Sequence, residues 1–140
     1  MDPLSIAAGI AGLLSLTLQV SKGIKTFAAA AIHERRDVHN LVGEIESIHS
    51  VLEELFSFLK GPQVNAIVFQ HSSALQIAME TCTRTIEDLQ KRLQKLEAGR
   101  LARSLERLKW PFSEKENQKV LETLGRCAAT FQFALTVEGW

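Results

Sequence analysis

Residues 38–59, VHNLVGEIESIHSVLEELFSFL, contain the most regular pattern in the chain. Their apolar residues recur at intervals of three and four, and only an α-helix places residues at that spacing on one face. Gly61 and Pro62 follow the pattern and are expected to end the helix. The stretch therefore predicts an amphipathic helix whose apolar face needs partners. The residues of this face are Val38, Leu41, Ile45, Ile48, Leu52, Leu55 and Leu59.

Two later segments repeat this helical spacing. One helix is expected to start as early as Gln63 and to end before Gly99, and the last long helix follows a capping box formed by Ser113 and Glu116. Between them, a short helix is expected to end before Pro111, because a residue before proline avoids α geometry. The apolar face of the third helix is Leu75, Ala78, Cys82, Ile86, Leu89, Leu93 and Leu96. That of the short helix is Leu101, Leu105 and Leu108, and that of the last helix is Leu121, Leu124, Ala128, Phe131 and Leu135.

The first helix is expected over about residues 3–31, with Asp2 as its cap and Pro3 in its first turn. No alternating strand pattern competes with the helices anywhere in the chain. Helices that each carry an apolar face bury those faces against one another. The sequence thus predicts an all-α fold, an up-and-down four-helix bundle with an additional short helix before the last long helix. At 140 residues, we expect a single domain over residues 1–140.

Composition and motifs argue against catalysis. Sixteen basic and sixteen acidic residues balance, which is unlike a nucleic-acid-binding protein. No phosphate-binding loop is present, and the histidines do not fall at metal-ligand spacing. Cys82 and Cys127 lie inside apolar helical patterns, so we interpret them as buried reduced thiols in a cytosolic protein. We expect no catalytic residue, no metal and no cofactor.

The N-terminal helix is the least ordinary feature, because residues 4–20 carry no charge. Its apolar side chains appear on all sides of the helix axis, so it must be buried, either at the centre of the bundle or in a membrane. As the central helix it would use Ala8 and Gly12 for close helix contact. In a membrane, Lys22 and Lys25 would mark the interface. The candidate membrane-inserting residues are Leu4, Ile6, Ile10, Leu13, Leu14, Leu16, Leu18 and Val20.

A basic stretch spans the third helix and the expected short helix. Only Glu97 and Glu106 oppose its seven cations, and no aromatic residues interleave with them for base stacking. A solvated helix surface and an anionic-lipid contact both fit this composition. The candidate lipid-contacting residues are Lys91, Arg92, Lys95, Arg100, Arg103, Arg107 and Lys109.

Two motifs resemble the HeLo-like N-terminal domains of fungal STAND receptors, which are similar to animal NLR proteins. One is the opening MDPLSIAAGIAGL of residues 1–13. The other, more specific motif is LKWPFSEKE of residues 108–116, with Trp110 and Pro111 at its centre, which leads to LETL of residues 121–124. The resemblance covers nearly the whole chain. One departure is that no acidic residue lies between Pro3 and Ser21, whereas some HeLo-type helices carry one.

The resemblance implies a cell-death execution module, similar to the four-helix domain of the necroptotic mixed-lineage kinase-like pseudokinase. Such a module would be cytoplasmic at rest, self-associate on activation, insert its first helix into the plasma membrane and permeabilise it. Its partners would be anionic membrane lipids, other copies of itself, and a downstream nucleotide-binding receptor region or an amyloid-signalling partner, with no nucleic acid. The alternative function is a non-enzymatic helical adaptor or oligomerisation domain of a fungal NLR-like receptor.

Overall fold

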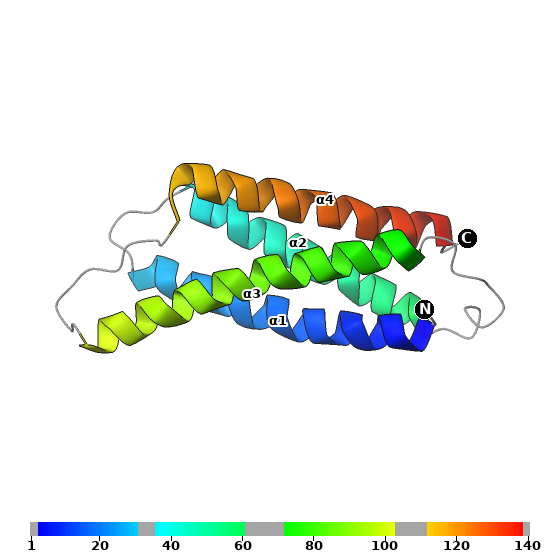
Figure 1. Cartoon of the computed structure of the whole chain (residues 1–140), viewed down its shortest axis with the longest axis horizontal. Coiled ribbons are helices and arrows are strands. Elements are labelled where there is room, and N and C mark those ends of the chain that lie inside the picture. The colour runs from blue at the N-terminus through cyan, green and yellow to red at the C-terminus, as the bar shows by residue number, and fades with distance from the viewer. Residues whose placement is uncertain (1–2, 31–35, 61–71, 103–111, 139–140) are drawn as a thin grey trace.

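The computed structural model describes residues 3–30, 36–60, 72–102 and 112–138. These residues form four helices, α1 (Pro3–Ala30), α2 (Arg36–Leu59), α3 (Ser72–Ala102) and α4 (Glu114–Glu138), and the described part of the chain contains no strand. Figure 1 shows that successive helices run in opposite directions along one long axis. The predicted all-α, up-and-down four-helix bundle is confirmed.

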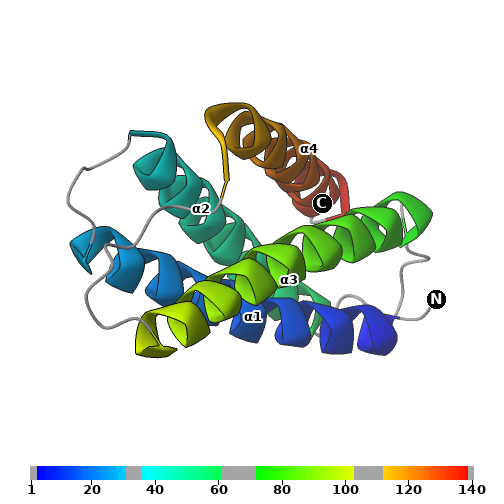
Figure 2. The ribbon, with the colours of Figure 1, turned by 60° about the vertical axis from the view of Figure 1, so that its left-hand side comes forward.

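The helices are not arranged around the bundle in chain order. α1 packs against α2 and α3, and α4 packs against the same two helices, so α1 and α4 occupy opposite corners (Figure 2). This arrangement contradicts the idea that α1 is a central helix wrapped by the other three. α1 instead has two neighbours and leaves one side to solvent.

The core consists of the apolar faces that the spacing predicted. All seven residues of the α2 pattern are at most 4% exposed. Leu75 and Ile86 of α3 and Phe131 of α4 are fully buried beside them. Cys82 and Cys127 are also buried as free thiols, as predicted. The bundle is therefore held together mainly by removal of apolar side chains from water.

The third helix differs from the sequence prediction at its C-terminal end. The third helix begins at Ser72, and the residues before it back to Gly61 lie outside the described part of the chain. Gly99 does not end this helix, because α3 continues through Leu101 to Ala102. No described glycine has a positive φ, which a glycine cap would require. The expected short helix thus has no separate start, and its remaining residues, 103–108, lie outside the described ranges.

Gly9 of α1 lies against the side chain of Met79 on α3. A Cβ atom at Gly9 would collide with the terminal methyl group of Met79, whereas a Cβ at Gly12 would meet no atom within 4 Å. The open space around Gly12 contradicts the prediction that its small size permits close helix contact, and Ala8 is exposed. The small residue that lies against α3 is Gly9.

Candidate functional site: the first helix and its neighbours

One face of α1 is buried in the core. This buried face contains half of the candidate membrane-inserting residues. Leu14 and Leu16 are half-buried, Leu18 is 47% exposed, and the side chain of Leu4 lies outside the description. The buried face recurs at intervals of one, three and four residues, so α1 does form an apolar stripe, contrary to the sequence interpretation. Its buried residues are Ile6, Ala7, Ile10, Leu13, Thr17, Val20, Ser21, Ile24 and Phe27.

The opposite face of α1 is exposed and uncharged over its first five turns. It consists mostly of small side chains, with Leu18 as its large apolar member. The first charged residue of the helix is Lys22, and Lys25 pairs with Glu46 of α2 at 2.8 Å. The exposed residues between Ser5 and Lys22 are Ser5, Ala8, Gly9, Ala11, Gly12, Ser15, Leu18 and Gln19.

Ser5–Phe27 is long and apolar enough to cross a membrane by length and composition, the one such segment among the described residues. Of its 18-residue window, 39% is buried inside the bundle, and a core helix of a soluble protein passes the same test. At about 1.5 Å per residue these 23 residues span about 35 Å, more than a bilayer's hydrocarbon core of about 30 Å. Length therefore does not prevent insertion, although residues 4–20 alone are too short.

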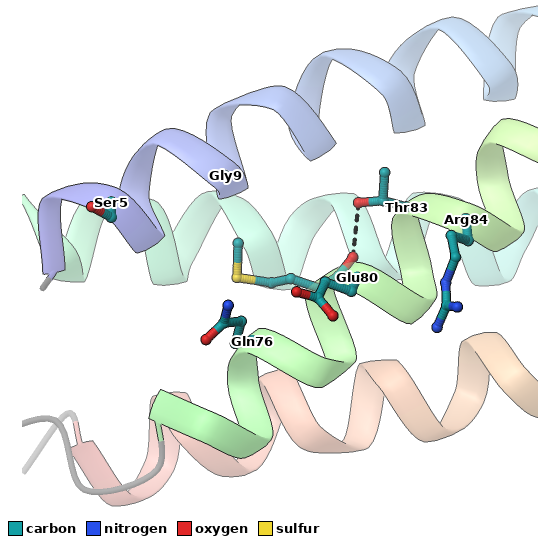
Figure 3. Close-up of a pocket in the computed structure, with 7 residues that line it drawn as sticks. Ser5, Gly9, Gln76, Glu80, Thr83 and Arg84 are labelled. Carbon is teal, nitrogen blue, oxygen red and sulfur yellow. Dashed lines mark hydrogen bonds between the residues drawn. The ribbon is translucent and has the colours of Figure 1, made fainter. Parts of the chain in front are cut away.

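A shallow groove separates the N-terminal half of α1 from α3 (Figure 3). One hollow of about 440 Å³ lies between Ser5 and Gly9 on α1 and Glu80 and Arg84 on α3. In this hollow the Thr83 hydroxyl donates to the Met79 carbonyl at 2.8 Å, so the hydroxyl belongs to its own helix.

A polar contact that the sequence analysis missed joins α1 to α2. Thr17 is fully buried, and its Oγ1 lies 2.8 Å from Nδ1 of His49. Nε2 of His49 is 2.8 Å from Oε1 of Glu53. The order hydroxyl, imidazole, carboxylate is that of a hydrolase triad, but burial of Thr17 prevents a substrate from reaching the hydroxyl. We interpret this contact as a structural link between α1 and α2. Its only sign in the sequence is a threonine at a core position of α1.

Three of the seven candidate lipid-contacting residues have described side chains. Lys91 and Lys95 are exposed on α3. Arg92 is already engaged, with Glu116 at 2.9 Å, Asp88 at 3.6 Å and the ring of Phe112 below its guanidinium. The side chain of Arg100 is not described, and Arg103, Arg107, Lys109, Trp110 and Pro111 lie outside the described residues.

The start of α4 is fixed by directional contacts. The amide of Glu116 donates to Oγ of Ser113 at 3.1 Å, and the amide of Ser113 donates to the Glu116 carboxylate at 3.5 Å, which confirms the capping box. The Arg92 guanidinium and the Ser113 amide lower the pKa of Glu116. Asn117, fully buried, donates to the carbonyl of Asp37 at 2.9 Å and so links α4 to the first turn of α2.

Comparison with known proteins shows the family to which this chain belongs. Residues 1–132 match the family model described as pigment biosynthesis cluster protein PigL N-terminal. The azaphilone pigments biosynthesis cluster protein L of Monascus ruber is 30% identical over 133 residues, which cover 90% of this chain and 28% of that protein. The chain thus spans less than a third of this relative's length. No solved structure matches.

Proposed function

Because the chain belongs to the PigL N-terminal family of HeLo-like fungal domains, we propose that it is a membrane-permeabilising module that inserts α1. In the resting state α1 covers the core from one corner of the bundle. On activation several copies associate, α1 leaves the bundle and enters the plasma membrane, and the resulting permeability leads to cell death. Nothing in this proposal requires an enzyme activity or a cofactor.

The observation that carries the proposal is the uncharged exposed side of α1, which lies opposite a buried face that is mostly apolar. From Ser5 to Gln19 neither face of the helix presents a charge. Backbone groups of a helix are satisfied internally, so such a segment can exchange protein neighbours for lipid tails. Lys91 and Lys95 on α3 would attract the bundle to anionic headgroups, each contributing about 1 kcal/mol near the surface.

Leu18→Asp tests insertion directly, because residue 18 is exposed and close to the middle of Ser5–Phe27. A carboxylate there costs about 3 kcal/mol in the hydrocarbon core, or roughly a hundredfold in partitioning. We expect the wild-type chain, clustered through a fused dimerising tag, to release dye from anionic phospholipid vesicles and the variant to lose this activity. Circular dichroism should show both folded.

Ile77→Asp is the matched control, since Ile77 is 63% exposed but lies on α3. It adds the same charge at an exposed apolar position on another helix, and we expect dye release to persist. Equal loss in both variants, or no release by the clustered wild type, would contradict the insertion of α1.

The second candidate function is an adaptor that only binds other proteins. It is favoured by the complete burial of Ile6 and Ile10, which makes α1 part of the core, and by the length of the Monascus ruber relative. In this case the bundle would be the docking module of a longer protein. It predicts that the clustered wild-type chain leaves vesicles intact.

A further inference from the structure

The outer surfaces of α2 and α3 carry opposite charges. Each of these helices packs against α1 and α4, so α2 and α3 occupy the second pair of opposite corners of the bundle (Figure 2). No lysine or arginine lies between positions 37 and 59. The exposed acidic residues of α2 are Glu46, Glu53 and Glu54, and the exposed basic residues described on α3 are Arg84, Lys91 and Lys95.

Contacts with α1 show that the two charged surfaces lie at the same height along the bundle. His49 of α2 lies beside Thr17, and the Gln90 amide of α3 donates to Gln19 at 3.2 Å. Thr17 and Gln19 are two residues apart, about 3 Å along the helix, so His49 and Gln90 share nearly one height. α2 and α3 run in opposite directions, so residues after His49 are level with residues before Gln90 (Figure 1).

This register places opposite charges level with each other. Counted from the shared height, Glu54 lies five residues further along α2 and Arg84 lies six residues back along α3. Glu46 and Lys91, on the other side of that height, are level to within about one turn. The guanidinium of Arg84 is directed away from α1 (Figure 3). Neither Glu54 nor Arg84 forms an ion pair with another of the described residues.

The other acidic groups of α3 do not oppose this match. Asp88 follows Arg84 by one turn, but it pairs with Arg92 at 3.6 Å and is level with the uncharged Ser50 of α2. Glu80 and Glu87 line the groove that α3 forms with α1. The outer surface of α3 is therefore basic where the outer surface of α2 is acidic.

We propose that the outer face of α2 binds the outer face of α3 on a second copy of this chain. The inference rests on the association of copies in the proposed function, and it names the surfaces that meet. Both surfaces are exposed in the bundle, so the contact does not require release of α1. Because they lie at opposite corners, two paired copies keep one free surface of each sign, and further copies can add in a ring or a filament.

Sedimentation velocity of the folded 140-residue chain, without lipid, measures this association. Exposed ion pairs are weak, so we expect the average mass to rise only at high protein concentration and to fall again when salt screens the charges. Glu54→Arg and Arg84→Glu should each weaken the association by at least about tenfold, because each places like charges opposite one another. Circular dichroism should show both variants folded.

An equimolar mixture of the two variants separates this interface from a general effect of charge. In the mixture the new arginine of one variant meets the new glutamate of the other, and the unchanged surfaces meet as in the wild type. Association should therefore return, although each variant alone has lost it. Arg126→Glu, at an exposed position of α4, is the matched control and should associate like the wild type.

Three results would overturn the proposal. They are a wild-type chain that stays monomeric at every concentration, a mixture that stays as monomeric as its components, and an equal loss in Arg126→Glu. None of these variants changes Lys91 or Lys95, so the proposed headgroup contacts are retained. Absence of dye release from vesicles by a chain that does self-associate would contradict the insertion of α1 and leave this interface in place.

Discussion

The first helix and the start of the last helix are attached to the bundle by different kinds of contact. α1 is held by a buried apolar stripe, to which Thr17 adds one buried polar contact and Lys25 a surface ion pair. The start of α4 is held by the Ser113–Glu116 capping box, the Arg92 ion pair and the buried amide of Asn117.

The difference indicates which helix can change its surroundings. Apolar contacts are non-directional, and lipid tails can replace them. Hydrogen bonds are directional, and a buried polar group that loses its partner costs about 1–3 kcal/mol. By this measure, the proposed release of α1 would cost the buried contact between Thr17 and His49, whereas release of the start of α4 would cost several directional contacts.

The largest expected effect comes from shortening a buried side chain of α1. Ile10→Ala removes methyl and methylene groups from a fully buried position, and such changes destabilise by about 2–5 kcal/mol. Urea unfolding monitored by circular dichroism measures this loss. Leu18→Ala is the control on the same helix, with an expected change within about 0.5 kcal/mol because its side chain is 47% exposed. Similar losses at both positions would show that the two faces of α1 do not differ.

A smaller effect is expected from the polar attachment of α4. Asn117→Ala deprives the Asp37 carbonyl of a hydrogen bond from a fully buried amide, which should lower the free energy of unfolding by about 1–3 kcal/mol. Gln118→Ala, at the neighbouring exposed position, should change stability by less than about 0.5 kcal/mol. If Asn117→Ala is as stable as Gln118→Ala, the link between α2 and α4 is not a stabilising contact.

The helical pattern predicted much of this architecture because burial follows spacing. Every apolar residue of the 38–59 pattern is in the core, and Ser113 caps α4 through the box that its spacing from Glu116 indicated. The pattern did not predict which helices are neighbours, since each amphipathic face is compatible with several partners. The opposite corners of α1 and α4 follow from packing between whole helices.

The candidate site could be predicted from the sequence only in part, because some of its features depend on how the helices pack. The lack of charge over the first five turns of α1 was identified correctly, but the large apolar residues that were expected on all sides of the axis are not equally buried. Leu14 and Leu16 are half-buried and Leu18 is 47% exposed. The contact between Thr17 and His49 joins two helices, and neither residue reveals it alone.

The smallest expected effect concerns the pH dependence of the α4 start. The Arg92 guanidinium, together with the Ser113 amide, lowers the pKa of the Glu116 carboxyl in the folded chain. A lowered folded-state pKa contributes stability that is present above the unfolded pKa of about 4.3 and is lost as pH falls through the folded value. Glu116→Gln lacks this contribution. The stability difference between wild type and variant should therefore be largest at neutral pH and shrink in acid.

Urea unfolding of both chains from neutral pH to about pH 3 measures this difference, which should stay small because Glu116 is exposed and solvent screens its ion pair. Glu122→Gln is the matched control on α4, two turns beyond the cap, where the carboxylate bonds only weakly to Gln118 at 3.5 Å. Parallel stability curves for wild type and Glu116→Gln would show that Arg92 and Ser113 do not hold the charged form of Glu116. A pH-dependent difference confined to Glu116→Gln would instead show that the attachment of the start of α4 depends on the charge of Glu116.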